Sequence, residues 1–389
     1  MDRSRLMHTY GEPTVTFVSG SGTTLVDDQG RHYLDFLCGL AVTSLGHAHP
    51  AVAEAVGNQA ATLLHLSNLF GNELGPEVAT LLDGLIADAQ GRHGRVFLCN
   101  SGAEANECAL KLARKARPGR YVVISAGEAF HGRTLATLAA THQSAKQAPF
   151  QPLPDGFERV AFGDLGAARA VLARGDVAGV LIECIQAEGG INVPEPGYLP
   201  GLEQACREFG ALFMVDEVQT GLGRTGQWFS FQNEQLTPDV VTMAKALGNG
   251  VPVGACWAAE EIADAFVPGD HGTTYGGQPL AMSAARATLR TMINIDAPAL
   301  AQAAGAKLRN QLIDLPGVVD VRGRGLLLGI ALSDAKAGAV VAECLNQGLI
   351  LNAVRPDTIR MTPPLMVSDE EIARAVEILA AVLTEEMQP

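Results

Sequence analysis

Two acidic residues end the apolar run ALFMVDE, and a glycine-rich stretch follows them in VQTGLGRTG. The acids are Asp216 and Glu217, and a carboxylate fixed at a strand end can keep a heteroaromatic nitrogen protonated. The glycines at positions 221, 223 and 226 also match G-x-G-x-x-G, the pattern of dinucleotide sites. The segment therefore supports two hypotheses, a dinucleotide site built on the glycines or a site built on the acid beside an ordinary turn.

The residues after the glycines argue against the dinucleotide hypothesis. A dinucleotide fingerprint must open a helix, yet Gly226 is followed by QWFSFQNE, which is aromatic and starts a helix poorly. Asp239 lies further along the chain and could bind a ribose, so a nicotinamide-dependent oxidoreductase stays a remote alternative. For Asp216, a carboxylate that only caps the following turn also remains possible as an interpretation.

One lysine stands in an apolar setting. Lys245 lies in VVTMAKALGNG, flanked by Ala244 and Ala246. Lysine is seldom fully buried without a partner. When it is buried, its pKa falls and its amine becomes a nucleophile suited to Schiff-base chemistry. The flanking alanines disfavour the simpler interpretation, a lysine whose amine extends to water.

The segment NSGAEANE predicts a turn from a strand into a helix at Ser101, Gly102 and Ala103. Exposed N–H groups at such a helix N-terminus form a phosphate site, and glycine lets the backbone come close. Capping of the same helix by Asn100 or Ser101 explains the segment equally well. The residues alone leave both interpretations open.

A further loop, GEAFHGR, carries Phe130 and Arg133. An aromatic ring at a strand end can stack on a flat cofactor, and arginine offers a fixed fork of donors to a carboxylate. Taken singly, Phe130 fits a core residue and Arg133 a surface arginine. Taken together, a phosphate site, a ring stacker, an acid and a buried lysine are what pyridoxal phosphate requires. A dinucleotide needs neither the lysine nor an acid ahead of the glycines.

Apolar runs and helical segments alternate from about residue 95 onwards. The runs are RVFLC, RYVVIS, VAGVLIE, ALFMVDE and PDVVTMA, and helical segments such as AEANECALKLARKA lie between them. Short Val/Ile/Leu runs between helices predict an α/β fold with a mostly parallel sheet that helices cover on both faces. Ligands bind beyond the carboxyl ends of such strands, so the candidate groups are expected to converge at one edge.

The two ends of the chain predict a smaller α+β domain. After about residue 295, GRGLLLGIAL, GLILNA and TIRMTPP alternate with helical segments, and TLVDDQGRHYLDFLCG predicts a β-hairpin near the N-terminus. We predict an N-terminal segment of the small domain over residues 1–50, a large cofactor-binding domain over 51–290 and a C-terminal small domain over 291–389.

The composition limits the classes of partner and location. The 389 residues are 47% hydrophobic and carry a net charge of −14, which argues against nucleic acid and anionic membranes as partners. No apolar stretch approaches the ~20 residues that span a bilayer, and no signal peptide is expected. Seven dispersed cysteines predict reduced thiols and a cytoplasmic protein. His47 and His49 in GHAHP lack a third ligand cluster, so no metal site is expected.

Several long motifs, in the same order, resemble the class III, fold-type I aminotransferases that use pyridoxal 5′-phosphate. The likeness runs nearly end to end and is greatest to the acetylornithine aminotransferases of arginine biosynthesis. It rests on YLDFLCGLAVTSLGHAHP, NSGAEANECALKLAR, AFHGRT, MVDEVQTGLGRTG, AKALGNGVPVGA, HGTTYGGQPLA and IRMTPPL. Small departures at Cys184, Ala187 and Gln278 replace the usual proline, glycine and asparagine and leave the charged groups intact.

The resemblance implies a role for each matching position. Lys245 would be the catalytic Schiff-base lysine, and Asp216 the partner of the pyridine nitrogen. Other cofactor contacts are implied for Gly102, Ala103 and Thr274 at the phosphate, Phe130 over the ring face, Gln219 near the ring hydroxyl, and Ser101, Glu217 and Val218 beside them. Substrate contacts are implied for Arg133 and Thr273, and for Arg360, which would bind the α-carboxylate of glutamate with Glu188 as its reversible partner.

The resemblance also implies the reaction and the assembly. The δ-amino group of N2-acetylornithine would pass to the cofactor, and 2-oxoglutarate would remove it as glutamate. Transaminases of ornithine, 4-aminobutyrate, succinyl-diaminopimelate or carrier-linked lysine share this frame and are the alternatives. The family implies a homodimer with shared active sites, in which Thr274 reaches the site of the other subunit.

Overall fold

A seven-stranded sheet forms the centre of the computed structural model, which describes residues 5–386 apart from the side chains of residues 89 and 90. In spatial order its strands are β4 (Gly94–Cys99), β10 (Gly254–Ala259), β9 (Val240–Met243), β8 (Leu212–Asp216), β7 (Val177–Ile182), β5 (Val122–Ala126) and β6 (Phe157–Val160). Strand β10 runs antiparallel to both of its neighbours, and the other pairs are parallel. The predicted α/β fold with a mostly parallel sheet is confirmed.

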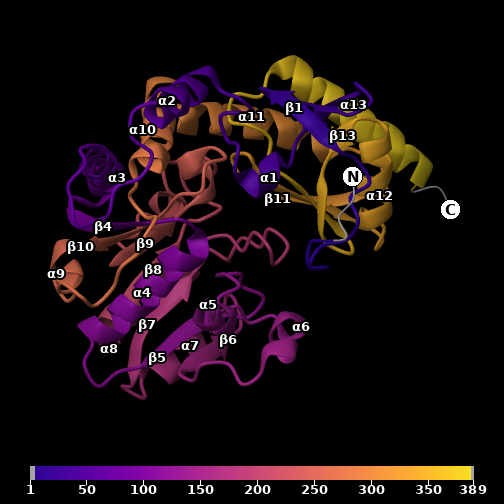
Figure 1. Cartoon of the computed structure of the whole chain (residues 1–389). Coiled ribbons are helices and arrows are strands. Elements are labelled where there is room, and N and C mark those ends of the chain that lie inside the picture. The colour runs from indigo at the N-terminus through magenta and orange to yellow at the C-terminus, as the bar shows by residue number, and fades with distance from the viewer. Residues whose placement is uncertain (1–4, 387–389) are drawn as a thin grey trace.

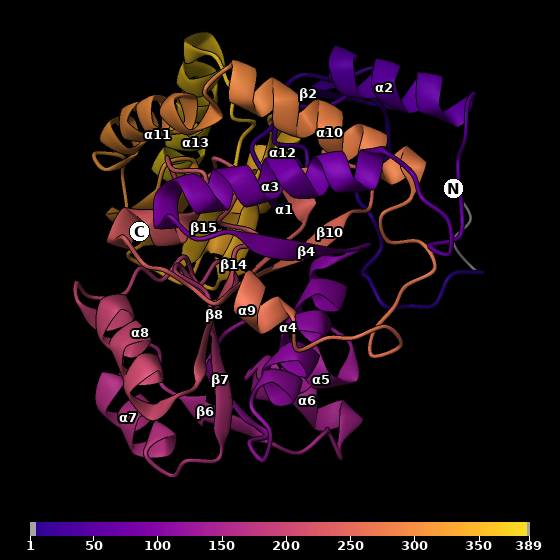
Figure 2. The same ribbon diagram turned by 90° about the vertical axis from the view of Figure 1, so that its left-hand side faces the viewer.

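Helices cover both faces of this sheet because its crossovers run in two directions. One group is α4 (Gly102–Ala116), α5 (Leu135–Ala140), α6 (Ser144–Gln147) and η1 (Ala148–Phe150), and the other is α7 (Leu165–Leu172) and α8 (Tyr198–Phe209) (Figure 2). Connections from β4 and β5 step towards β6, whereas those from β6 and β7 step back towards β4. Right-handed crossovers of opposite direction place their helices on opposite faces. The direction reverses between β5 and β7, where ligands of open α/β sheets bind.

The inner strands are buried at every residue, as unbroken apolar runs predict. This holds for β5, β7, β8, β9 and β10. Side chains on both sides of the pleat pack against helices, so Val, Ile and Leu follow one another without polar alternation. The strands therefore form a rigid base, and their one charged residue, Asp216, is the last residue of β8.

Further helices pack around the β4 edge and along the top of the molecule. They are α1 (Cys38–Ala41), α2 (Pro50–Ala60), α3 (Leu74–Gln90), α9 (Glu260–Ala263), α10 (Pro279–Asn294), η2 (Ser230–Glu234) and η3 (Lys245–Gly248). Figure 1 shows α10 running beside α2 and above the sheet. Both α2 and α10 begin at a proline, whose missing N–H costs nothing in the first turn.

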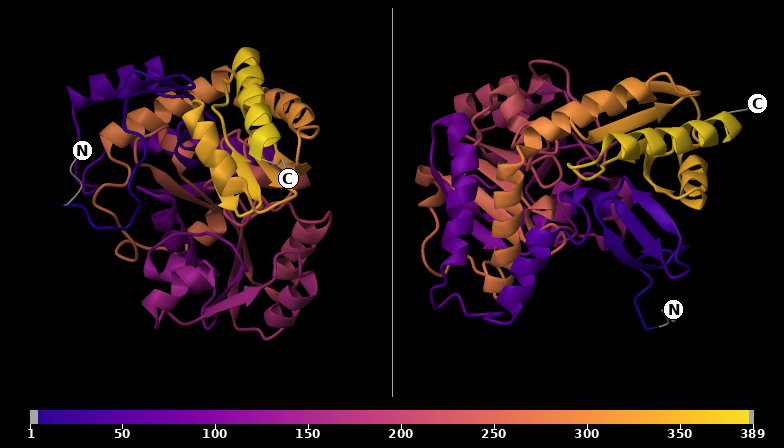
Figure 3. Two further views of the ribbon diagram at one scale, coloured as in Figure 1. Left: turned by 90° about the vertical axis from the view of Figure 1, so that its right-hand side faces the viewer. Right: turned by 90° about the horizontal axis from the view of Figure 1, so that it is seen from above.

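The two ends of the chain meet in two smaller sheets. Strands β1 (Phe17–Ser21), β2 (Thr24–Asp27) and β3 (His32–Asp35) are joined by β13 (Leu349–Ile350), and β11 (Val318–Arg324), β12 (Leu327–Leu332), β15 (Thr358–Met361) and β14 (Asn352–Arg355) form the other sheet. Helices α11 (Ala297–Leu312), α12 (Ala337–Asn346) and α13 (Asp369–Glu386) complete this part. Figure 3 shows the N-terminal strands beside the C-terminal elements, and β13 pairs in parallel with β3.

The predicted domain boundaries stay predictions, although the elements can be placed against them. The boundary at residue 50 coincides with the start of α2, and the one at residue 290 falls inside α10. The N-terminal hairpin and its contact with the C-terminal part follow the prediction. Among residues 5–386, no helix is long and apolar enough to cross a membrane.

Candidate active site

Side chains from separate segments line one cavity of about 450 Å³ beyond the carboxyl ends of β5, β7, β8 and β9. This volume is within the range of small-molecule sites. Of the residues predicted for the site, the lining includes Ser101, Gly102, Ala103, Phe130, Arg133, Glu188, Asp216, Val218, Gln219 and Lys245. The fold thus brings together groups that lie up to 144 positions apart, from 101 to 245, in the sequence.

Asp216 is the last residue of β8, and three donors hold its carboxylate. Its Oδ2 accepts hydrogen bonds from Asn106 Nδ2 and His131 Nδ1, both at 2.8 Å, and its Oδ1 accepts from the Val218 N–H at 3.0 Å. Burial lowers the pKa of His131, but the hydrogen bond and charge of Asp216 outweigh burial and raise it above its usual value. The buried carboxylate is therefore fixed in orientation and paired with a proton-bearing imidazole.

The supporting residues of Asp216 were not among the predicted site residues. His131 stands beside Phe130 in AFHGRT, so its segment was recognised but its role was not. Asn106 lies in α4, and its Oδ1 accepts a hydrogen bond from Thr242 Oγ1 of β9 at 2.7 Å. Nothing in local spacing signals these contacts, because they depend on how α4 lies across the sheet.

Lys245 is the first residue of η3, separated from the end of β9 by Ala244, and it adopts a left-handed backbone conformation with φ of +47°. This region is uncommon for residues other than glycine, and such conformations concentrate at functional sites. Burial lowers the pKa of the Lys245 amine to about 8, although the charge of Glu188 opposes the shift. A substantial fraction of the amine is therefore neutral near physiological pH.

The N-terminus of α4 is consistent with both interpretations of NSGAEANE, helix capping and a phosphate site. Ser101 Oγ accepts a hydrogen bond from the Glu104 N–H at 3.2 Å and caps the helix. The N–H groups of Gly102 and Ala103 have no acceptor among the described residues, and both residues line the cavity. Two N–H groups at the positive end of a 15-residue helix suit a phosphate.

Gly102 is also required by packing. A Cβ atom at this position would lie 2.8 Å from the side chain of Val218, in the loop after β8. That contact is too short for real Cβ atoms, so one of the two segments would have to move. The helix terminus and the Asp216 loop are therefore fitted to each other through this glycine.

Phe130 and Arg133 come from the loop after β5, at the reversal point of the sheet. The Phe130 N–H donates to Glu183 Oε2 at 3.2 Å, which fixes the loop to the end of β7. Two cations face the Phe130 ring: the Arg133 guanidinium at 5.7 Å and Lys146 Nζ at 5.8 Å from its centre. Arg133 is exposed at the cavity wall and can therefore meet an incoming carboxylate.

Arg360 lies behind the cavity wall rather than in it. It projects from β15 and is fully buried, and its Nη1 donates to Glu188 Oε1 and, at 2.9 Å, to Gln219 Oε1. Burial raises the pKa of Glu188, but the charge and hydrogen bond of Arg360 outweigh burial and lower it below its usual value. Glu188 is therefore ionised, and together with Gln219 it separates the guanidinium from the cavity.

Glu183 is another buried acid at the cavity that sequence reasoning did not assign. Burial, together with the nearby charge of Asp216, raises the pKa of Glu183 to about 8, although His131 opposes the shift. The acid therefore carries its proton over most of the neutral range. Glu183 is the last residue of the run VAGVLIE, and its raised pKa arises chiefly from burial, which local sequence does not show.

Three predicted residues lie away from the cavity. Glu217 follows Asp216, and its side chain accepts hydrogen bonds from Thr220 Oγ1 and from the Phe231 N–H at 2.8 Å. Thr273 Oγ1 accepts from the Gly276 N–H at 3.1 Å, and Thr274 is exposed. Of the three, Thr273 is connected to the cavity, because its Oγ1 also accepts from Asn100 Nδ2 at 3.3 Å and Asn100 lines the cavity.

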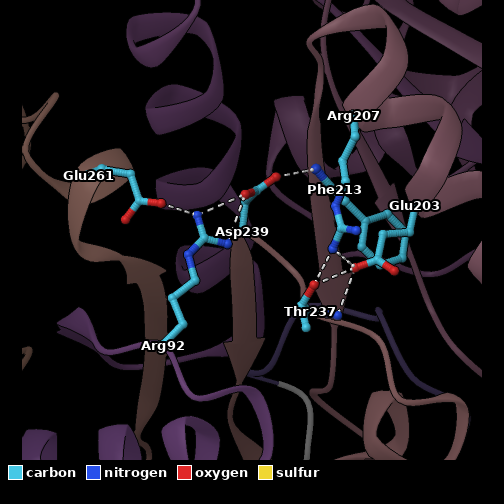
Figure 4. Close-up of polar contacts among 7 residues, drawn as sticks. All are labelled: Arg92, Glu203, Arg207, Phe213, Thr237, Asp239 and Glu261. Carbon is cyan, nitrogen blue, oxygen red and sulfur yellow. Dashed lines mark hydrogen bonds and ion pairs between the residues drawn. The ribbon is translucent and has the colours of Figure 1, made fainter.

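The glycines of GLGRTG form a turn, as the argument against a dinucleotide site expects. The next regular element is the short η2, which begins at Ser230, so the glycines open no helix. Asp239, the acid considered for a ribose, is engaged elsewhere (Figure 4): its Oδ2 accepts from the Phe213 N–H at 2.9 Å and its Oδ1 pairs with Arg92. Asp239 therefore links the start of β9 to β8 and has a structural role in the sheet rather than a role in binding a ribose.

The part of the chain from residue 5 to residue 386 contains no group of three His, Cys, Asp or Glu side chains that could hold a metal ion. All seven cysteines are buried and unpaired.

Comparisons with known proteins extend this picture. Residues 7–383 match the family model of class-III aminotransferases. An acetylornithine aminotransferase of Corynebacterium efficiens is 48% identical, over 98% of this chain and 95% of that protein. The crystal structure of an ornithine aminotransferase from Toxoplasma gondii superposes with a TM-score of 0.93 at 33% identity, covering 100% of this chain and 94% of that one. The crystal structure of an N-acetylornithine aminotransferase from Stenotrophomonas maltophilia superposes with a TM-score of 0.83 at 35% identity, covering 97% of this chain and 97% of that one.

The family match spans nearly the whole chain, and the relative from C. efficiens shares almost half of its residues. The cavity sits where the motifs of the sequence converge. The chain therefore belongs to the class-III aminotransferases, the pyridoxal-phosphate-dependent family that its motifs resemble.

Proposed function

We propose that the protein transfers the δ-amino group of N2-acetylornithine to 2-oxoglutarate, giving N-acetylglutamate 5-semialdehyde and glutamate, in the cytoplasm. The observation that carries this proposal is one cavity lined by Lys245, Asp216 and Glu188, with a buried arginine bonded to Glu188 behind the cavity wall. The first two residues suit pyridoxal phosphate. The covered arginine suits an enzyme that must accept one substrate with a carboxylate near the reacting carbon and one without it.

The residues present fit the cofactor. The unpartnered N–H groups of Gly102 and Ala103 would hold its phosphate, and Phe130 would lie over its ring. Asp216, oriented by Asn106 and His131, would bind the ring nitrogen in its protonated form. When bound, pyridoxal phosphate supplies an electron sink for the carbon that loses a proton, and it carries the amino group between the two substrates.

Lys245 is the proposed attachment residue and the base of the reaction. Its amine needs to be neutral to act as a nucleophile and to take a proton, and burial brings its pKa to about 8. The left-handed backbone at Lys245 and the apolar residues around it hold the amine at the cavity. When it is not attached to the cofactor, Nζ would remove the proton from the reacting carbon of the substrate and hold it for the next proton transfer.

Two arginines divide the substrate carboxylates between them. Arg133, at the cavity wall, would bind the single carboxylate of acetylornithine, which is far from the reacting amine. Arg360 would bind the α-carboxylate of glutamate after Glu188 moves aside. While acetylornithine is bound, Glu188 keeps the buried guanidinium paired, because an unpaired buried charge is costly.

Sequence identity, rather than similarity of fold, favours acetylornithine over the alternative substrates. The ornithine aminotransferase of T. gondii superposes closely at 33% identity, whereas the acetylornithine aminotransferase of C. efficiens is 48% identical. A panel of amine donors with 2-oxoglutarate decides among acetylornithine, ornithine, 4-aminobutyrate, succinyl-diaminopimelate and carrier-linked lysine. Acetylornithine should give the highest kcat/KM, and a higher value for another donor would replace it as the substrate.

A visible spectrum separates this proposal from the oxidoreductase alternative. Pyridoxal phosphate attached to the protein colours it yellow, whereas a bound nicotinamide dinucleotide does not absorb in the visible range. The purified protein should therefore be yellow, and a colourless protein that takes up a dinucleotide would reject the proposal.

A further inference from the structure

The buried Arg360 has a second neighbour that the switch with Glu188 does not use. Its Nη2 donates to Asn352 Oδ1 at 2.8 Å. Asn352 opens β14, and the register of the β14–β15 pair sets it directly opposite Arg360. Directly opposed residues of an antiparallel pair place their side chains on the same face. The contact is therefore built into the sheet.

The partners of Arg360 differ in charge. Asn352 and Gln219 offer neutral amide oxygens, and Glu188 is the one carboxylate bonded to the guanidinium within the described part of the chain. The Asn352 oxygen, rather than its nitrogen, must face Arg360, because a guanidinium only donates. Arg360 is thus held in position at Nη2 by a group that leaves its positive charge uncompensated.

We infer that Asn352 is a positioning residue that sets specificity by being neutral: it fixes Arg360 while leaving the charge to be exchanged between Glu188 and the substrate α-carboxylate. This inference rests on the proposed function of Arg360. Glu188 lies on a loop and can move aside, whereas position 352 is tied to Arg360 by strand pairing. A carboxylate at position 352 would stay with the guanidinium and repel an incoming α-carboxylate.

Exchange of one amide nitrogen for oxygen tests the charge with little change of shape. Asn352→Asp keeps an acceptor for Nη2 and adds a negative charge, whereas Asn352→Ala removes the acceptor and adds none. Asn346→Asp, on the exposed end of α12 in the same part of the molecule, is the matched control for added charge. Glutarate serves as the probe because it carries the two carboxylates of 2-oxoglutarate and cannot react.

Calorimetric titration of each holoenzyme with glutarate should give an ordered series. Asn352→Asp should weaken binding by about tenfold or more and Asn352→Ala by about threefold, because like charge opposes the ligand more than a lost hydrogen bond does. Asn346→Asp should bind like the wild type. In single-turnover assays, Asn352→Asp should raise the glutamate concentration that gives half of the maximal rate, with little change in that maximal rate, and should leave the acetylornithine half-reaction within about twofold of the wild type.

The order of the two variants is decisive. If Asn352 only supports Arg360 structurally, Asn352→Asp retains the hydrogen bond and binds glutarate better than Asn352→Ala, which would overturn the inference. Arg360→Ala separates this failure from that of the proposed function. If Arg360→Ala leaves glutarate binding unchanged, Arg360 is not the carboxylate site. If it abolishes binding while Asn352→Asp does not weaken it, the role of Asn352 alone is wrong. Thermal unfolding of each variant confirms that it is folded.

Discussion

The carboxylate of Asp216 shows how individual residues acquire their chemistry here. A single acid at a strand end fits a turn cap as well as a cofactor partner, and the sequence leaves both open. In the structure the same carboxylate receives hydrogen bonds from Asn106 and His131 as well as from the Val218 N–H, which is the cap-like contact. Both interpretations describe real contacts, and the two side-chain donors favour the second.

Asp216→Asn should preserve the fold while removing most of the activity, at least about a hundredfold in kcat, because an amide cannot keep the ring nitrogen protonated. The measurement is steady-state turnover alongside thermal unfolding. Asp239→Asn, which alters an acid engaged in the sheet contacts of Figure 4, is the comparison: it should lower stability more than turnover per folded molecule. If folded Asp216→Asn turned over at nearly the wild-type rate, the cofactor role would be rejected and only the interpretation of Asp216 as a turn cap would remain.

The pKa of Lys245 predicts how cofactor attachment depends on pH. Burial depresses this pKa to about 8, so the protonated amine dominates below pH 8 and the neutral amine above it. The rate at which the apoprotein attaches added pyridoxal phosphate should therefore rise with pH through about 8 and then level. Stopped-flow absorbance measures it, with Lys245→Ala as the blank and Lys111→Ala, an exposed lysine, as the control. A rise that continues to pH 10 would indicate an unperturbed, exposed lysine.

The Glu188–Arg360 pair predicts opposite effects in the two half-reactions. Glu188→Gln should slow the acetylornithine half-reaction and leave the glutamate half-reaction as fast or faster, because Arg360 then lacks a negative partner when no α-carboxylate is present. Arg360→Ala should chiefly impair glutamate. Single-turnover rates distinguish the two, and equal losses in both halves for both variants would show that no exchange occurs.

At the scale of elements, the central strands and the strand-end loops were predictable, because fully buried parallel strands leave unbroken apolar runs in the sequence. Two things were not. One is the direction of β10, which lies antiparallel between β4 and β9. Its residues form the same kind of apolar run as those of its neighbours, because the direction of a strand does not affect its composition. The contacts of Asp216 with Asn106 and of Arg360 with Asn352 depend on crossing and register, which arise only when the elements pack.

Gly102→Ala tests the fit between α4 and the Asp216 loop. The new Cβ would lie 2.8 Å from the Val218 side chain, so the variant should lose about 1–3 kcal/mol of stability and bind the cofactor more weakly. Gly84→Ala is the matched control: Gly84 lies within α3, and its Cβ would meet nothing within 4 Å. That variant should gain ~0.5–1 kcal/mol. Thermal unfolding measures the stability of both variants, and cofactor titration measures their cofactor binding. If Gly102→Ala changed neither, α4 and the Asp216 loop could move apart without cost.

At the scale of the whole molecule, a net charge of −14 surrounds a site that has to attract dicarboxylates. The cations are therefore local: Lys245 and Arg133 line the cavity, and Arg360 lies buried behind Glu188 and Gln219. The sequence predicted these residues through their motifs. The resemblance implied that Glu188 pairs with Arg360, but not that Gln219 also bonds to it, because that contact joins the loop after β8 to β15.

Thr274 predicts a homodimer with shared sites. It is exposed, as are the apolar side chains of Leu69, Phe70 and its neighbour Tyr275, which a second copy would bury. Asn68 links the two segments by donating to the Thr273 carbonyl at 3.0 Å. Mixing Lys245→Ala subunits with Thr274→Ala subunits should restore part of the activity, because a hybrid contains one site with both residues. An active monomer in light scattering, or no recovery, would contradict shared sites.

The most direct single measurement is a pair of consecutive half-reactions followed by visible absorbance in the purified protein. Acetylornithine alone should remove the yellow band in one turnover and release one equivalent of semialdehyde. Addition of 2-oxoglutarate should then restore the band and release one equivalent of glutamate. An unchanged band with acetylornithine, in a protein that holds the cofactor at Lys245 and responds to another amine, would contradict the proposed reaction.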